Sequence, residues 1–167
     1  MYLVLTHSSN LNPGGYIEHI DTEVGVACDD GTMPADSLLA SMGEIITACS
    51  ERSGRPIDCL PNMTERIKGA GFVNIKEKKY KVPLGSWPKH PLFKDAGRIG
   101  MVTYKAGIEG FVMYLSTMFG HPEPWTEDRT REYINGLKKE LDSKSHVYQN
   151  MKRVWAQKPY DAEPTEA

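Results

Sequence analysis

Apolar residues recur along this chain in two spacings, one typical of helices and one of strands. A helix is predicted to begin at the N-cap Asp36 and to end at Ser53-Gly54, because six apolar side chains repeat there at helical spacing. The six are Leu38, Leu39, Met42, Ile45, Ile46 and Cys49. A turn at 10–15 predicts a short strand at 16–20. A shorter helix, capped by Asn62 or Thr64, is predicted at 63–70 and ends before Gly71.

The second half of the chain continues this alternation. Residues 72–82 are predicted to form a strand whose lysines indicate an edge position. The helical stretch 93–119 contains four glycines, each costing about 1 kcal/mol relative to alanine, so it forms two helices or one that packs closely against another element. Thr126 caps a last helix, and 147–157 is predicted as the last strand. Strands separated by helices predict an α/β domain.

Composition narrows the class of protein. The chain has 167 residues, of which 40% are hydrophobic and 25% charged, and we expect one domain over 1–159 with a disordered tail over 160–167. The net charge of −2 disfavours nucleic acid as a partner, and no apolar run reaches the ~20 residues of a membrane span. The N-terminus does not resemble a signal peptide, so we expect a cytoplasmic protein.

Cysteine and histidine spacing gives no sign of a disulfide framework or a metal site. The three cysteines, Cys28, Cys49 and Cys59, are an odd number without a C-x-x-C pair. The five histidines contain no H-x-x-x-H pair. We therefore expect reduced thiols and no bound metal.

Several segments, in order, resemble one protein family. Asn12-Pro13-Gly14-Gly15-Tyr16-Ile17-Glu18-His19-Ile20-Asp21 is similar to the L-K-P-G-G-Y-I-E-H-x-D turn and strand of class I methyltransferases. Further segments match in the expected order: 29–32 (DDGT), 54–56 (GRP), 70–73 (AGFV), 80–88 (YKVPLGSWP), 137–141 (LKKEL), 146–148 (HVY) and 157–159 (QKP). Over roughly 10–159 the chain resembles the fungal LaeA-like or UMTA-type enzymes of secondary metabolism.

The resemblance implies a truncated Rossmann-like fold of about three strands with flanking helices. In the family, a seven-stranded sheet binds S-adenosylmethionine through its first half, by a glycine-rich turn after the first strand. The matching region begins just before the fifth strand, so this chain resembles the C-terminal, substrate-lid half. We expect no cofactor, and S-adenosylmethionine only if a partner chain supplies the glycine-rich half.

The missing half has consequences for the sheet and for assembly. The family order places the fifth, seventh and sixth strands side by side, so 16–20 becomes an open edge that invites pairing. The polar residues of 147–157 suggest that this strand is more exposed than in the family. A homodimer is expected, with 16–20, 1–5 and the apolar face of 38–49 as the contact surface. In a two-fold dimer the same apolar surface of each copy buries that of the other.

The candidate catalytic residues are Glu18, His19 and Asp21. They lie at the carboxyl end of the first matched strand, where open α/β sheets bind their ligands. An imidazole between two carboxylates can act as a general acid or base. The alternative is a solvated histidine at a sheet edge.

The candidate substrate-binding residues come from the resemblance. Trp87 resembles the tryptophan of the family's lid, which lies over the substrate. The alternative is a structural role, in which its side chain packs over a pair of helices. The others fall on the segment similar to the family's substrate-pocket helices: Tyr104, Met113, Tyr114, Met118 and Phe119. Methionine and aromatic residues on a helix are more often core, and that alternative stays open.

Three functions follow as hypotheses. The first is a methyltransferase-derived enzyme that no longer methylates, a cyclase or isomerase of the pericyclase kind acting on a hydrophobic natural-product intermediate. The second is a methyltransferase subunit completed by a separate cofactor-binding chain. The third is a non-catalytic interaction protein. The first is favoured, because the chain resembles a complete lid half and lacks only the methyl donor's site.

Overall fold

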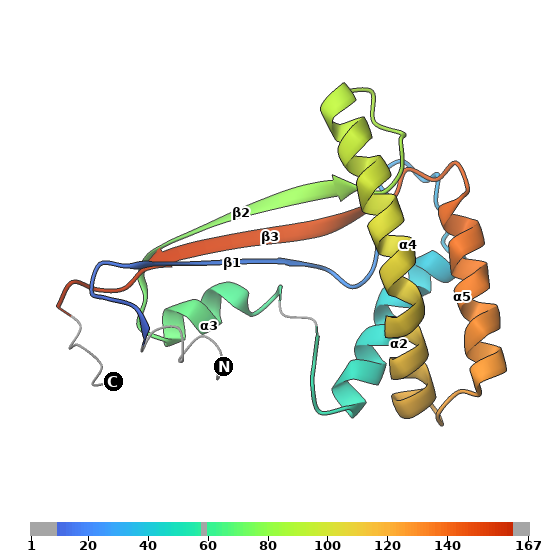
Figure 1. Ribbon diagram of the computed structural model, residues 1–167, viewed down its shortest axis with the longest axis horizontal. Coiled ribbons are helices and arrows are strands. Elements are labelled where there is room, and N and C mark those ends of the chain that lie inside the picture. The colour runs from blue at the N-terminus through green and yellow to red at the C-terminus, as the bar shows by residue number, and fades with distance from the viewer. Residues whose placement is uncertain (1–9, 58–59, 162–167) are drawn as a thin grey trace. The chain divides into compact units, whose positions relative to one another are not determined.

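The computed structural model describes residues 10–57 and 60–161, and strands alternate with helices along them (Figure 1). The seven elements are, in order, β1 (Tyr16–Thr22), α2 (Leu38–Arg52), α3 (Met63–Gly69), β2 (Val73–Pro83), α4 (Pro91–Phe119), α5 (Glu127–Leu141) and β3 (Tyr148–Gln157). The prediction of an α/β fold with about three strands and flanking helices is confirmed.

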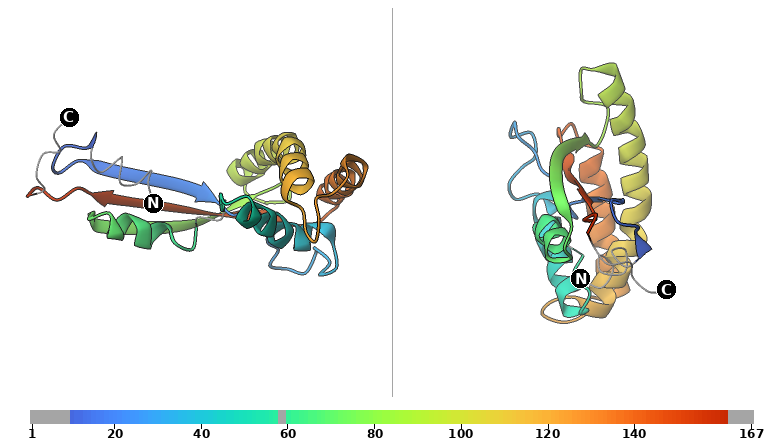
Figure 2. Two further views of the ribbon diagram at one scale, coloured as in Figure 1. Left: turned by 90° about the horizontal axis from the view of Figure 1, so that it is seen from below. Right: turned by 90° about the vertical axis from the view of Figure 1, so that its left-hand side faces the viewer.

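The three strands form one sheet in the order β1-β3-β2. β1 pairs antiparallel with β3 from Tyr16 opposite Gln157 to Thr22 opposite Met151, and the opposite directions of these two strands are visible in Figure 2. This order is the one implied by the resemblance, and it leaves β1 and β2 as the two edge strands of the sheet.

The polar residues of β3 are paired with neighbouring groups, and the expectation that this strand is more exposed than in the family stays a prediction. Every residue of β3 is buried or half-buried. Its lysine, Lys152, is 8% exposed and forms an ion pair with Glu77 at 3.0 Å. Gln157 donates to the carbonyl of Gly14 at 2.9 Å and accepts from the amide of Asn74 at 3.0 Å. Buried polar groups are tolerated when they are paired in this way.

Contacts divide the chain into two compact units. Among the described residues, the first unit comprises 10–22, 60–80 and 151–161, and the second comprises 23–57 and 81–150. The core of the first unit consists of Ile17, Met63, Ile67, Phe72, Val154 and Ala156. In the second unit α2, α4 and α5 contact one another around a separate core. Residues 162–167 of the predicted tail lie outside the described residues.

Capping of α2 differs by one residue from the prediction. Ser37, not Asp36, is the N-cap, and its hydroxyl accepts from the backbone N–H of Ala40 at 3.2 Å. The N–H groups of Leu38 and Leu39 both donate to the carboxylate of Glu140 on α5, at 3.0 and 2.9 Å. A tertiary contact thus satisfies donors that a helix start leaves unpaired.

The long helix α4 is continuous, and two of its glycines explain why. A Cβ at Gly97 would lie 2.1 Å from the carbonyl oxygen of Gly85, and one at Gly100 would lie 3.1 Å from that of Pro83. These glycines let the helix lie against the segment that follows β2. Of the two readings left open by the sequence, one closely packed helix is the correct one.

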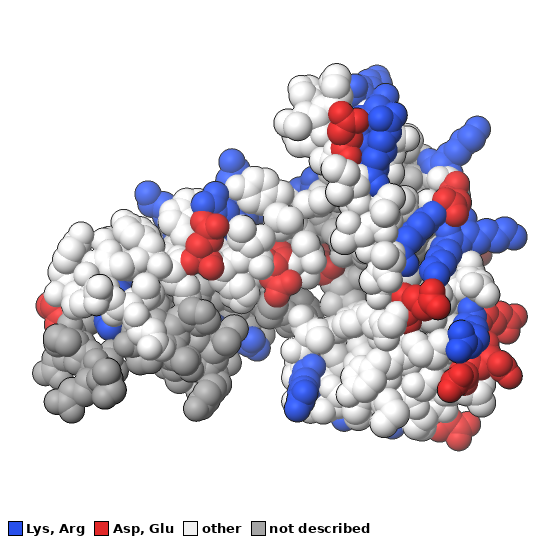
Figure 3. All heavy atoms as spheres, viewed as in Figure 1, with Lys and Arg blue, Asp and Glu red and all other residues white. Residues whose placement is uncertain are grey.

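The apolar face of α2 is core and cannot be the expected dimer surface. Leu39, Met42, Ile46 and Cys49 are at most 2% exposed and belong to the core of the second unit. The expected contact at 1–5 lies outside the described residues. Within the expected contact at 16–20, Tyr16 and Ile20 are exposed, and further exposed apolar side chains lie on α4. Figure 3 shows a mostly uncharged surface over α4 below its charged N-terminal end, beside the charged surface over α5.

None of the helices in the described part of the chain combines the length and hydrophobicity needed to cross a bilayer. Within residues 10–57 and 60–161, no group of three histidine, cysteine or acidic side chains is placed to hold a metal ion.

Candidate functional site

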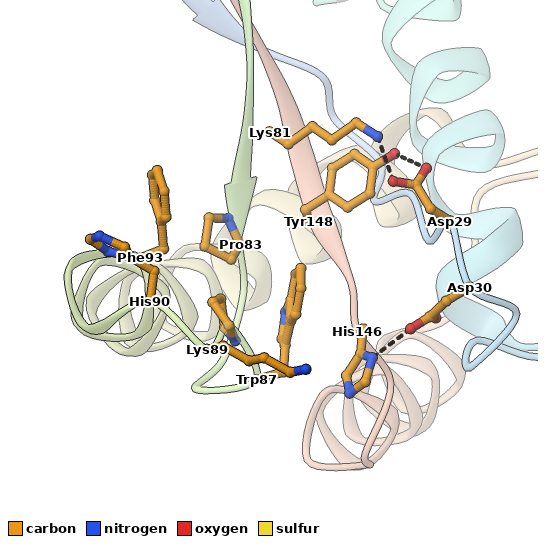
Figure 4. Close-up of a pocket in the computed structure, with 11 residues that line it drawn as sticks. Asp29, Asp30, Lys81, Pro83, Trp87, Lys89, His90, Phe93, His146 and Tyr148 are labelled. Carbon is orange, nitrogen blue, oxygen red and sulfur yellow. Dashed lines mark hydrogen bonds and ion pairs between the residues drawn. The ribbon is translucent and has the colours of Figure 1, made fainter.

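A cavity of about 370 Å³ lies in the second unit, where β2 ends and β3 begins. Pro83 comes from the end of β2 and Tyr148 from the first position of β3, while Asp29 and Asp30 come from the loop after β1. The remaining lining residues are Lys81, Trp87, Pro88, Lys89, His90, Phe93 and His146. Figure 4 shows the two aspartates pointing from one loop toward two different partners.

His146 and Asp30 form the first pair. The Nδ1 atom of His146 lies 2.6 Å from a carboxylate oxygen of Asp30. The hydroxyl of Thr32 donates to Asp30 at 2.7 Å, and the Thr32 backbone N–H and the Cys28 thiol donate as well. These hydrogen bonds, the Thr32 hydroxyl first and then His146, hold the pKa of the Asp30 carboxyl well below its usual range.

The ionised carboxylate fixes the imidazole tautomer. An ionised Asp30 can only accept, so Nδ1 of His146 must carry the proton that joins them. In neutral His146 the Nε2 atom then carries the free lone pair, and among the described residues it has no hydrogen-bond partner. An imidazole with one nitrogen hydrogen-bonded to a carboxylate and the other nitrogen accessible has the arrangement of a general base.

Trp87 fixes the position of the imidazole from one side. Its ring stacks on that of His146, with centroids 5.2 Å apart and 25° between the planes. The indole N–H donates to the carbonyl of Val147 at 3.0 Å, which holds Trp87 against the start of β3. The tryptophan, 38% exposed, is therefore both an anchor for His146 and part of the cavity wall.

Asp29, Lys81 and Tyr148 form a second cluster. The carboxylate of Asp29 accepts from the Tyr148 hydroxyl at 2.6 Å and pairs with the Lys81 ammonium, which also lies over the Tyr148 ring at 4.7 Å. The hydrogen bond from Lys81, and then that from Tyr148, lowers the pKa of Asp29, while the bond to Asp29 raises the pKa of Lys81. This cluster ties the loop to both β2 and β3.

Backbone hydrogen bonds join the loop that carries Asp29 and Asp30 to the segment that carries His146 and Tyr148. Ala27 and Tyr148 exchange both of their backbone hydrogen bonds, at 2.8 and 3.0 Å. The backbone N–H of His146 donates to the Thr32 hydroxyl at 2.7 Å, so Thr32 supports both His146 and Asp30. Gly31, at φ +71°, provides the left-handed turn between Asp30 and Thr32.

The predicted catalytic residues lie on β1, in the first unit, outside the lining of this cavity. His19 Nε2 is 3.9 Å from an Asp21 carboxylate oxygen. Glu18 instead pairs with Arg153 on β3, and Asp21 also accepts from the backbone N–H of Thr22 at 2.8 Å. Catalysis by these three residues stays a prediction.

Of the six predicted substrate-binding residues, Trp87 lines the cavity. Tyr104 is turned inward, and its hydroxyl donates to the carbonyl of Val24 at 3.3 Å. Met113 and Phe119 pack against the core of the second unit, whereas Tyr114 and Met118 are exposed on α4. Substrate binding by these five stays a prediction.

Sequence reasoning missed His146, Asp30, Lys81 and Tyr148 as site residues. The signal was present, because 29–32 and 146–148 both belong to the segments that resemble the family. Their chemistry was not recognised because more than a hundred residues separate the aspartates from the histidine. Tertiary contacts, among them the pairing of Ala27 with Tyr148 and the hydrogen bond from His146 to Thr32, bring them into one place.

No turn suited to the methyl donor is found in the described residues. One G-x-G, Gly69-Ala70-Gly71, occurs, but it closes α3 and leads into β2, with Gly71 at φ +84°. A dinucleotide-type turn follows a strand and opens a helix, so that backbone N–H groups face the ligand. The residues present therefore do not fit S-adenosylmethionine without a further glycine-rich segment.

Comparisons with known proteins find relatives among fungal methyltransferases and a fungal regulator of secondary metabolism. No family model matches. The methyltransferase pytC of Aspergillus terreus is 32% identical over 153 residues, which are 91% of this chain and 46% of the relative. The secondary metabolism regulator LAE1 of Cochliobolus heterostrophus is 32% identical over 150 residues, 88% of this chain and 48% of the relative. The probable methyltransferase tdiE of Emericella nidulans is 29% identical over 153 residues, 90% and 47% of the two chains.

A solved structure of phosphoethanolamine N-methyltransferase 2 from Haemonchus contortus is similar at a TM-score of 0.40 and 18% identity, over 94% of this chain and 29% of that one. The chain spans about half the length of the curated relatives it matches. These relatives cover about nine-tenths of the chain. Over about nine-tenths of its length, the chain is homologous to LaeA-like regulators and methyltransferases of fungi.

Proposed function

We propose that this chain binds a hydrophobic small molecule of fungal secondary metabolism in the cavity beside Trp87, and that His146 moves a proton on it. The observation that carries the proposal is the 2.6 Å contact between His146 Nδ1 and Asp30, which leaves Nε2 open. The apolar wall of Trp87, Pro88 and Phe93 supports binding of a planar or hydrophobic ligand.

The proton transfer follows from the arrangement. Neutral His146 accepts a proton from the ligand at Nε2, and the imidazolium that forms is stabilised by the Asp30 carboxylate at Nδ1. The same group returns the proton to another atom of the ligand. A positioned acid–base group of this kind contributes about 10²–10⁴-fold to a reaction rate.

The reaction we propose is a cyclisation or isomerisation that needs no methyl donor. It is supported by the completeness of the acid–base pair within this chain. Holding the ligand in a reactive conformation in the cavity adds to the rate, because orientation lowers the entropic part of the barrier.

A second candidate is methyl transfer assisted by a partner chain with a cofactor-binding half. It is supported by the relatives named methyltransferases, of which this chain spans about half. In this case His146 takes the proton from the ligand atom that receives the methyl group, and the methyl donor is held outside this chain. A non-catalytic interaction protein is the third candidate, and it predicts an unused cavity.

The test uses the three tryptophan indole N–H signals of the full chain in a ¹H–¹⁵N spectrum, with 2-naphthol as the probe. The signal of Trp87, assigned with Trp87→Phe, is expected to shift on titration, while those of Trp125 and Trp155 serve as internal controls because neither residue lines the cavity. A titration that moves no indole signal, or moves the other two equally, would overturn binding in this cavity.

We also propose that the chain forms a homodimer, with the exposed side of α4 as the contact surface. Four large apolar side chains lie opposite the buried side of this helix and are 57–70% exposed: Ile99, Val102, Tyr114 and Met118. Exposed large apolar side chains that gather on one helix favour contact with another protein surface. A second copy covers these side chains with the same surface through a two-fold axis.

A further inference from the structure

We infer that the cavity is selective for a ligand with an acidic hydroxyl group on a conjugated ring, such as a phenol, and that Lys89 holds the resulting oxyanion. The inference rests on the proposed function, because it assigns a substrate class to the same cavity. It begins from the charges that line the cavity.

All but one of the charges in the cavity wall already have a partner. Asp29 is paired with Lys81 and Tyr148, and Asp30 with His146 and Thr32. The Lys89 ammonium has no hydrogen bond or ion pair with any residue that the structure describes. Figure 4 shows its side chain extending past Trp87 on the side where His146 lies. Lys89 is exposed, so water solvates its ammonium group in the free chain, and a bound anionic group would replace that water as its partner.

Because Lys89 is a cation on the same side of the cavity as His146, it favours a ligand that becomes negatively charged when it gives up its proton. When a hydroxyl gives its proton to His146 Nε2, negative charge develops on the oxygen that remains. A cation beside that oxygen stabilises it, and the effect is larger where protein excludes water. The proton stays on the imidazole and the electron pair on the oxygen, so the step is balanced without any other reactant.

The basicity of the His146 imidazole limits which kinds of hydroxyl group can transfer a proton to it. When no bond forms to the oxygen in the same step, transfer to an imidazole leaves a free oxyanion, which forms far more readily from a phenol-type hydroxyl than from an aliphatic alcohol because the phenol pKa of about 10 lies nearer that of an imidazole. A hydroxyl on a conjugated ring is acidic enough. The ring fits the wall formed by Trp87, Pro88 and Phe93, whose aromatic side chains are 38% and 52% exposed.

The experiment measures the ionisation of bound 4-nitrophenol, whose phenolate absorbs at a different wavelength from the phenol. With protein in excess, the midpoint of ionisation is expected at a lower pH than for the free compound. Lys89→Met is expected to raise that midpoint by about 0.5 pH units, the size of one ion pair near a surface. Lys89→Arg keeps the charge and is expected to keep the shift.

Two controls separate the possible failures. Lys139→Met removes the same charge from the exposed surface of α5, and it is expected to leave the midpoint unchanged. The Trp87 indole signal reports whether 4-nitrophenol is in the cavity. If that signal moves and Lys89→Met leaves the midpoint as in the wild type, the role of Lys89 is overturned and binding in the cavity stands. If the signal does not move, the cavity proposal fails together with this one.

Discussion

At the scale of single residues, Asp30 is the most constrained group of the site. Four hydrogen bonds converge on its carboxylate, from His146, from the hydroxyl and backbone N–H of Thr32, and from Cys28. The sequence shows Asp29-Asp30-Gly31-Thr32 only as a turn. Periodicity cannot predict which partner each aspartate takes, because that depends on a contact with a strand more than a hundred residues away.

Asp30→Asn is expected to destabilise the chain in a pH-dependent way. The pKa of Asp30 is lowered in the folded state, so its carboxylate contributes stability above the unfolded value of about 3.9, and this contribution is lost as the pH falls through the folded value. The variant should therefore unfold at lower urea than the wild type at pH 7, and the difference should shrink below pH 4. A difference that stays constant from pH 7 to pH 3 would contradict this assignment.

At the scale of elements, the sequence predicts each helix and strand of the described chain to within a few residues. Apolar spacing and turn residues suffice for this, as at Thr126, which caps α5 and accepts from Arg129. What the sequence left open is set by tertiary contacts. Ser37 rather than Asp36 caps α2, and Glu140 of α5 supplies the other bonds to its first turn. The continuity of α4 likewise depends on the segment that lies against Gly97.

The same substitution at two glycines of α4 is expected to have opposite effects. Gly97→Ala places a Cβ 2.1 Å from the Gly85 carbonyl oxygen, so it must push the helix away and lower the free energy of unfolding by several kcal/mol. Gly107→Ala meets nothing within 4 Å and should stabilise by about 0.5–1 kcal/mol through helix propensity. Urea unfolding of both variants measures the two effects. Equal changes would show that Gly97 does not pack as described.

At the scale of the whole molecule, the chain spans about half the length of the fungal methyltransferases and regulators it matches. The resemblance predicted the strand order, because it supplied a topology that periodicity alone cannot give. Of the residues expected from the matched segments, Trp87 lines the cavity, while Glu18, His19 and Asp21 lie on β1 and their role stays a prediction. The cavity lies instead among the loops and strand ends of the second unit.

Isothermal calorimetry with the purified chain is expected to show no binding of S-adenosylmethionine at concentrations on the order of hundreds of micromolar. The physical reason is the lack, in the described residues, of a glycine turn that exposes backbone N–H groups at a helix start. A clear isotherm in the micromolar range would show that the chain binds the methyl donor by another route.

Light scattering at micromolar concentration tests the homodimer. The wild type is expected at about twice the chain mass of 18.7 kDa. Val102→Glu combined with Tyr114→Glu should give the monomer, because both side chains are exposed on α4 and the new charges would face each other in the dimer. Lys144→Glu, in the exposed loop after α5, is the control and should leave the mass unchanged. A monomeric wild type would contradict the proposal.

The most direct test of the acid–base account is the tautomer of His146, measured in a long-range ¹H–¹⁵N spectrum of the imidazoles at pH 8. With His146 assigned by His146→Gln, we expect the proton on Nδ1, facing Asp30, and an unprotonated Nε2 whose signal changes when 4-nitrophenol is added. A proton on Nε2, or an Nε2 signal that ignores the ligand, would contradict the account.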